Sequence, residues 1–251
     1  MVTNRQGDTG MTLLELVITM TLSAFLILGL IQIASAASSS TQLQRNQAQI
    51  QEHARLAANT LTGAIRQTGF TPEPWNEAYA PMGLAEPSLD NVSISSDRLA
   101  VRSWSDLNCF NNINPDRDSS GNPLFYIREF VFDLNSDNGL TQQCRYGPSL
   151  TEFTTQVRRQ GFIQGVESFQ VLYGRDSDGD GSIEAWVKAG QWSDPQHILG
   201  VRFGLLLSSQ DAVTKAVSKS YAVLDSTASK RADGKLRRVV VFTAAIKGRT
   251  G

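Results

Sequence analysis

One apolar run near the N-terminus constrains this chain more than any other feature of its sequence. The segment GMTLLELVITMTLSAFLILGL begins at Gly10, and Glu15 is the only charged side chain between Asp8 and Arg45. Residues 13–37 are long enough to cross a bilayer as a helix, which takes about 20 apolar residues. A charge near the bilayer centre costs roughly 3 kcal/mol. Glu15 therefore either lies at the membrane interface as a helix-end residue or has a partner.

The ten residues before the run, MVTNRQGDTG, are short and polar, and no A-x-A cleavage site of an ordinary signal peptide follows. This polar leader ends in Gly10, MTLLEL comes next, and the pattern resembles the type IV prepilin signal. In that family a prepilin peptidase cuts after the glycine and the new first residue, here Met11 instead of the usual Phe, is methylated. The resemblance implies that Glu15 pairs with the N-terminal amine of a neighbouring subunit and sets its register. Two charges that are each costly in an apolar filament core become tolerable when they are paired.

The helical pattern continues beyond the apolar run. Apolar residues recur at spacings of three, four and seven and predict one stripe on a polar helix: Leu43, Ile50, Ala54, Ala57, Leu61 and Ile65. Gly69 and Pro72 are stop signals. We therefore expect one helix over residues 13–68, about 84 Å long at 1.5 Å per residue. A coiled coil is the competing interpretation, but the stripe is short and rich in alanine.

Strand-like segments dominate the rest of the chain, after a proline-rich loop at residues 70–90. Five segments are rich in β-branched or aromatic residues: VSISSDRLAVRSW, LFYIREFVFDL, GVESFQVLYG, ILGVRFGLLLSS and LRRVVVFTAAIKG. An antiparallel sheet packed on the amphipathic part of the helix is the economical arrangement, an α+β, pilin-like fold. The expected parts are a leader at 1–10, a membrane or filament-core helix at 11–37, an amphipathic helix at 38–69 and a β-rich periplasmic domain at 70–251.

Later motifs narrow the resemblance. AIRQTGF at the end of the helix, GVESFQVLYGRDSDGDG, VRFGLLLSS and RRVVVFTAAIKGR together resemble the PilW family of type IV pilus minor pilins. Residues 71–160 carry no specific match. The alternative is a minor pseudopilin of a type II secretion system, similar to GspJ, because pilins and pseudopilins share the N-terminal signal.

The resemblance to PilW implies a minor pilin that primes pilus assembly and lies near the tip. Its implied partners are other minor pilins, the major pilin, the prepilin peptidase, the inner-membrane assembly platform and a tip adhesin. The implied location is the bacterial inner membrane, with a single pass and a periplasmic domain, and then the pilus at the cell surface, in a system for adhesion and twitching motility.

The chain contains two cysteines, Cys109 and Cys144. In a domain delivered to an oxidising periplasm, such a pair is most simply explained as a disulfide. Closing a loop of about 36 residues would stabilise the fold by roughly 3–4 kcal/mol on the chain-entropy account. Two buried free thiols are the alternative.

An acidic segment, DSDGDGSIE at residues 176–184, carries the clearest chemical pattern of the β-rich part. Carboxylates at alternate positions before a glycine are typical of a calcium loop, whose oxygen ligands suit a hard cation. The candidate structural Ca²⁺ ligands are Asp176, Asp178, Asp180, the carbonyl of Ser182, and Glu184. Val187 stands where such loops carry a bidentate glutamate. The alternative is a solvated, metal-free turn; DRDSSG at 116 and DLNSDNG at 133 echo the pattern and are interpreted as turns.

Motifs for catalysis or for nucleic-acid binding are not evident in the sequence. The net charge is −1, which gives no argument for nucleic acid as a partner. Two histidines, His53 and His197, leave few candidates for a general base, and no P-loop or nucleophile motif occurs. We therefore expect no enzymatic activity. A membrane-anchored, calcium-dependent hydrolase is the alternative from a different class.

Overall fold

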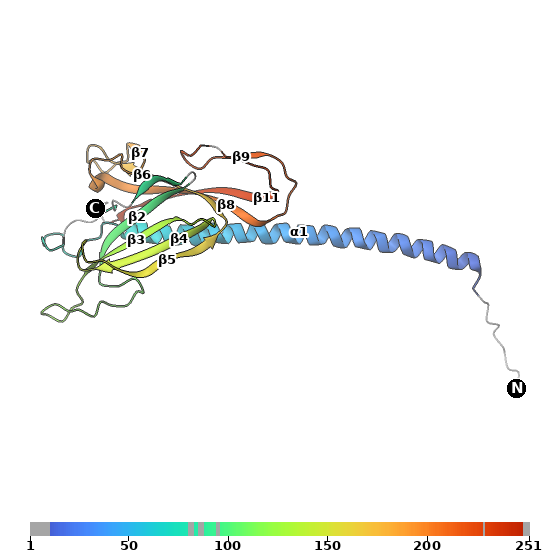
Figure 1. Cartoon of the computed structure of the whole chain (residues 1–251), viewed down its shortest axis with the longest axis horizontal. Helices are drawn as coiled ribbons and strands as arrows, with labels where there is room; N and C mark the ends of the chain where they lie inside the picture. The colour runs from blue at the N-terminus through green and yellow to red at the C-terminus, as the bar shows by residue number, and fades with distance from the viewer. Residues whose placement is uncertain (1–10, 80–82, 85–87, 94–95, 228, 248–251) are drawn as a thin grey trace, which may run out of the picture. The chain divides into compact units, whose positions relative to one another are not determined.

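The computed structural model describes residues 11–79, 83–84, 88–93, 96–227 and 229–247. It forms two compact units, residues 1–45 and residues 46–251. One helix and eleven strands follow in chain order, with one 3-10 turn, η1: α1 (Leu13–Gln67), β1 (Leu89–Ser93), β2 (Ser96–Ser105), β3 (Tyr126–Leu134), β4 (Gly139–Gly147), β5 (Thr154–Gln164), β6 (Val166–Arg175), β7 (Ala185–Val187), η1 (Pro195–His197), β8 (Ile198–Ala212), β9 (Lys219–Tyr221), β10 (Ser229–Arg231) and β11 (Lys235–Ala245) (Figure 1).

In the first unit, every side chain of residues 11–42 is exposed. Leu13 is 84% exposed and Phe25 is 74% exposed, so this helix has no core of its own. Its few polar side chains bond to the helix backbone, since the hydroxyls of Thr19 and Thr21 each donate to a carbonyl three residues earlier at 2.9 Å. Such local bonds leave no side-chain hydroxyl of these two residues in need of water. The segment is thus suited to an apolar environment.

In the second unit, residues 46–67 of α1 bury one stripe against the sheet. Ile50, Ala54, Ala57, Leu61 and Ile65 are all buried and belong to the main hydrophobic core. This confirms the predicted stripe with one correction: Leu43 is half-exposed, and the buried residues begin at Asn46. The last turn ends at Gln67, and Gly69 adopts a φ of 77°, a conformation that glycine reaches without strain.

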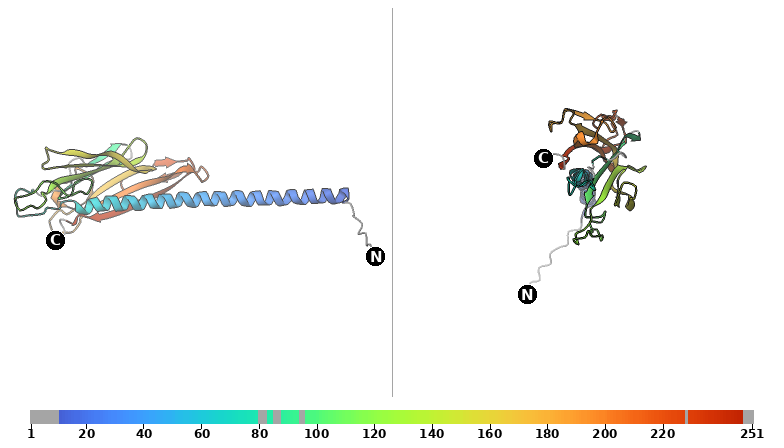
Figure 2. Two further views of the ribbon diagram at one scale, coloured as in Figure 1. Left: turned by 90° about the horizontal axis from the view of Figure 1, so that it is seen from below. Right: turned by 90° about the vertical axis from the view of Figure 1, so that its left-hand side faces the viewer.

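The strands form one mostly antiparallel nine-stranded sheet with the path β11-β8-β6-β2-β3-β4-β5; β1 pairs with β2 and β7 with β6. The contact between β2 and β6 is parallel and joins Ser96 to Phe169. β9 and β10 form a separate two-stranded ribbon. In the end-on view the sheet bends around the packed part of α1 (Figure 2).

All five predicted strand segments are strands, although the first is divided into β1 and β2. The predicted loop ends earlier than expected, because β1 begins at Leu89. The inward faces of β6 and β8 follow the alternation of a strand. The core residues on β6 are Phe169, Val171 and Tyr173, and those on β8 are Val201, Phe203, Leu205 and Leu207. Sequence reasoning missed β4, β5, β7, β9 and β10.

The polar groups of the core are bonded across the sheet. Asp97 of β2 is buried, and its carboxylate accepts from the backbone N–H of Val171 on β6 at 2.8 Å. This bond strengthens the contact between β2 and β6, whose parallel register joins Ser96 to Phe169. Gly165, between β5 and β6, has a φ of 75°, and a Cβ atom there would lie 2.6 Å from the carbonyl oxygen of Ser208. Only glycine therefore fits this tight turn.

Candidate functional site

Thr12 and Glu15 cap the N-terminus of α1. The Glu15 carboxylate accepts from the backbone N–H of Thr12 at 2.9 Å and from its hydroxyl at 3.0 Å, and the Thr12 hydroxyl accepts from the Glu15 N–H at 3.3 Å. This is a reciprocal capping box. Among the described residues of the single chain, no cationic side chain pairs with Glu15. Its carboxylate is thus held beside the peptide group that follows Met11. Gly10, the expected cleavage site, and the rest of the leader lie outside the described residues.

The apolar part of α1 is long enough and apolar enough to cross a membrane. Its best 18-residue window has a mean hydropathy of 2.3, and none of that window is buried in the chain. Leaving so much apolar surface in water is unfavourable by about 25 cal/mol per Å². The segment therefore requires an apolar partner outside this chain.

Cys109 and Cys144 form a disulfide with their Cα atoms 5.9 Å apart. Cys144 is a buried residue of β4, and Cys109 lies in the long loop between β2 and β3. The Cys109 N–H also donates to the side chain of Gln156 on β5 at 2.9 Å. The bridge and this bond attach the loop to two strands at the β5 edge of the sheet.

The acidic loop between β6 and β7 is organised around Asp176. This carboxylate is buried and accepts from the backbone N–H groups of Gly179 at 2.6 Å and Gly181 at 3.0 Å. Its own N–H donates to the carbonyl of His197, which ties the loop to the start of β8. Burial tends to raise the pKa of Asp176, but the glycine N–H groups outweigh it and hold that pKa below its ordinary value. Asp176 is therefore kept as a carboxylate.

The predicted calcium ligands do converge in space. One carboxylate oxygen from each of Asp176, Asp178, Asp180 and Glu184 lies within 4.8 Å of the others. Two oxygens that are each 2.3–2.6 Å from one Ca²⁺ are at most about 5 Å apart, so the spacing fits this ion. Ser182 lies in the same loop and donates its N–H to Asp180 at 2.7 Å. Val187, at the position of the missing glutamate, belongs to β7.

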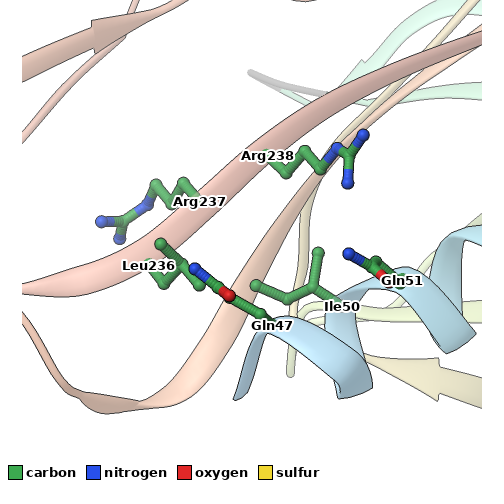
Figure 3. Close-up of a pocket in the computed structure, with 6 residues that line it drawn as sticks. All are labelled: Gln47, Ile50, Gln51, Leu236, Arg237 and Arg238. Atoms are coloured by element: carbon green, nitrogen blue, oxygen red, sulfur yellow. The ribbon is translucent and has the colours of Figure 1, made fainter. Parts of the chain in front are cut away.

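A groove separates the packed part of α1 from β11, an edge strand of the sheet. Its upper part is a hollow of about 270 Å³ whose six lining residues come from both elements: Gln47, Ile50, Gln51, Leu236, Arg237 and Arg238 (Figure 3). In this view Ile50 lies between Gln47 and Gln51 on the helix side, and Leu236, Arg237 and Arg238 lie on the strand side. Val239 and Val241 are 36% and 46% exposed farther along β11. The β11 side of the groove therefore carries both apolar and basic side chains.

Residues 71–160, which carried no specific family match, contain charged pairs on the face of the sheet away from the core. Glu129 of β3 is fully buried and pairs with Arg102 of β2 at 2.6 Å and with Arg145 of β4. A similar group joins Asp133 to Arg98 at 3.3 Å and to Arg159 at 2.8 Å. The cross-strand registers place Arg102 and Arg145 directly opposite Glu129. The observed role of the two groups is to hold strands β2 to β5 together.

Comparison with known proteins gave three results. The family described as PilW, type IV pilus-assembly protein W, matches residues 136–247. No curated protein matches the chain. A solved structure of a type IV-like pilin, TTHA1219 from Thermus thermophilus, is similar at 13% identity with a TM-score of 0.48, over 80% of this chain and 96% of that one. The matched region runs from the β3–β4 turn to the end of β11 and contains the acidic loop. By this match, residues 136–247, slightly less than half of the chain, are similar to the PilW family.

Proposed function

We propose that this protein is a minor pilin that joins other minor pilins in the inner membrane and primes assembly of a type IV pilus. The observation that carries the proposal is the exposed apolar helix of residues 13–42 in a chain whose residues 136–247 match the PilW family. Such a helix needs an apolar partner, and a bilayer before assembly and a filament core after it both supply one. The large second unit, residues 46–251, would crowd a slender shaft, which favours a position near the tip.

The prepilin peptidase cuts after Gly10 in this proposal, and the new amine of Met11 is methylated. Glu15 then exchanges its bonds to Thr12 for the amine of a neighbouring subunit. Glu15 is exposed, and no cationic side chain among the described residues pairs with it, so its carboxylate is available to that amine. In an apolar core a paired carboxylate and amine avoid a cost of roughly 3 kcal/mol per unpaired charge. The remaining partners are the major pilin, the inner-membrane assembly platform and a tip adhesin.

The proposal includes a structural Ca²⁺ in the loop of residues 176–184. Supporting it are the four converging carboxylates and the glycine N–H groups that keep Asp176 charged. A cation there would offset the mutual repulsion of four acids in one turn. Its role is to rigidify the connection between β6 and β7; no chemical step depends on it.

The calcium proposal is tested by the melting temperature of the full-length protein in detergent. A ligand at ten times its Kd stabilises a folded protein enough to raise the melting temperature of a domain this size by about 3–6 °C. Ca²⁺ should give this rise, and Asp178→Ala should remove it. Asp137→Ala, in an exposed turn of a different acidic segment, is the matched control and should keep it. If Ca²⁺ changes the melting temperature of both variants equally, the loop is a metal-free turn.

The assembly proposal is tested by deleting the gene. Surface pili should become scarce while the major pilin remains in the membrane, and blocking retraction at the same time should restore some fibres. Mass spectrometry should find Met11 as the methylated mature N-terminus. If piliation and motility are unchanged but export of a secreted enzyme stops, the protein is a pseudopilin. If only a hydrolytic activity disappears, the helix is a mere anchor.

A further inference from the structure

A second hollow lies on the core side of β3, beside the last two turns of α1. It has a volume of about 190 Å³. The helix contributes Thr60, Gly63, Ala64 and Gln67, and the sheet and its neighbouring loop contribute Asn111, Arg128, Phe130, Phe132 and Gln142. Nothing lies within 4 Å of the place where a Cβ atom of Gly63 would be, so the hollow is open at this point of the helix.

Arg128 is the charged residue of this hollow. Its hydrogen-bond partners among the described residues are neutral, and the Asp106 carboxylate acts on it through its charge. It is only 6% exposed. Its guanidinium donates to the side chain of Gln67 at 2.7 Å, and to the carbonyl of Asn108 and the side chain of Asn111 at 3.3 Å each. Its Nε is buried without a hydrogen-bond partner. Among the described residues, no carboxylate forms an ion pair with it.

Arg237, another buried arginine, has the carboxylate partners that Arg128 lacks. The Arg237 side chain is 3% exposed, and it pairs with Glu167 at 2.8 Å and with Asp233 at 2.6 Å. A buried cation without such a partner is expensive to desolvate, and burial accordingly lowers the pKa of Arg128. The C-terminal end of α1 supplies only about half a negative charge nearby. None of the residues that line the hollow is acidic, so Arg128 has no carboxylate partner within it.

The remaining walls indicate what kind of anion fits. Phe130 and Phe132 line the hollow, and the Cζ atom of Arg128 lies 5.2 Å from the centroid of the Phe130 ring. An apolar or aromatic stem can pack on these rings while its carboxylate meets the guanidinium, a geometry that arginine binds through parallel N–H donors. A small hydrated ion would leave the rings uncovered.

We propose that this hollow binds a carboxylate carried on an apolar stem, and that an acidic side chain of a neighbouring pilin subunit supplies it. The site stands on the charge and shape of the hollow alone; only the identity of the partner rests on the proposed function. Arg128 is the charged anchor, and Gly63 is the opening that admits the stem.

The first arm of the test uses phenylacetate as the probe and the full-length protein in detergent. Phenylacetate at about ten times its Kd should raise the melting temperature by about 3–6 °C, and the neutral phenylacetamide at equal ionic strength should not. Gly63→Leu places a larger side chain in the hollow while Arg128 is kept, and it should abolish the shift. Gly63→Ala leaves the hollow open and should retain it. Arg128→Met should also lose it. No shift in the unmodified protein, or an equal shift in Gly63→Leu, would overturn the site.

The second arm identifies the source of the carboxylate. The protein is co-expressed with the minor pilins encoded beside it, and their recovery with each variant is measured. Gly63→Leu should reduce recovery at least about tenfold relative to Gly63→Ala, since a factor of ten corresponds to a modest loss of binding free energy. If both variants recover the minor pilins equally while the unmodified protein still responds to phenylacetate, a neighbouring pilin is not the source of the carboxylate. The ligand would then be a free carboxylate. This arm is independent of pilus production, so it fails separately from the proposed function.

Discussion

Residues 13–42 and residues 46–67 belong to one helix, but they depend on different partners. In the first segment all side chains are exposed, whereas in the second a stripe of five apolar residues is buried in the core of the sheet. The first segment therefore depends on an apolar partner outside the chain, proposed above to be a membrane or filament, and the second belongs to a unit with its own core, disulfide and ion pairs. Changes within the second unit should alter stability, and changes in the first should alter assembly only.

The largest effect on stability should come from the disulfide. Replacing both cysteines, in Cys109→Ala/Cys144→Ala, should lower the free energy of unfolding of the second unit by roughly 3–4 kcal/mol, because a loop of 35 residues is released. Denaturant unfolding of the full-length protein measures this, and retention in the membrane should not change. A loss of membrane retention at equal stability would break the comparison.

A smaller effect should come from the stripe. Leu61 is fully buried, so Leu61→Ala should cost about 3 kcal/mol through lost burial and the cavity left behind. Leu26→Ala is the matched control, because Leu26 is 70% exposed in the first segment, and its effect on unfolding should stay within about 0.5 kcal/mol. Similar costs at the two positions would show that the segments share one core.

The smallest effect on stability should be seen in acid. The hydrogen bonds that Arg237 donates hold the pKa of Asp233 below its usual value. A lowered folded-state pKa gives stability that is present above the unfolded pKa, about 3.9, and is lost as pH falls below it. Below about pH 4 the free energy of unfolding should therefore depend less steeply on pH in Asp233→Asn. The difference in slope should correspond to the uptake of at most about one proton on unfolding. Parallel curves for variant and unmodified protein would contradict this ion pair.

Local patterns predicted the features that are local in the structure. The stripe of α1 and the inward residues of β6 and β8 follow single periodicities, and the acidic ligands converge because they lie within nine residues. β4 and β5 escaped prediction because their sequences, GLTQQCRYG and TTQVRRQGFIQ, are rich in polar residues. Those polar residues are explained only by partners on neighbouring strands, as Arg145 is by Glu129.

The Arg128 hollow could not have been predicted for the same reason. Its neutral partners Gln67 and Asn111 stand 61 and 17 residues away in the chain, and no spacing connects them. A buried arginine within a strand resembles any exposed one in sequence. What distinguishes it is that its hydrogen-bond partners among the described residues are all neutral, and only three-dimensional contacts reveal that.

The most direct test of the account concerns two acids on the same helix. Glu15→Ala removes the carboxylate of the first segment, and Glu52→Ala removes an exposed carboxylate that forms an ion pair with Arg55. The amount of each variant in sheared pili, relative to its processed pool in the membrane, is measured by quantitative mass spectrometry. The account predicts normal processing for both, normal incorporation of Glu52→Ala, and a loss of at least about tenfold for Glu15→Ala, since 1.4 kcal/mol of lost pairing is a factor of ten. Equal incorporation of the two variants would contradict it.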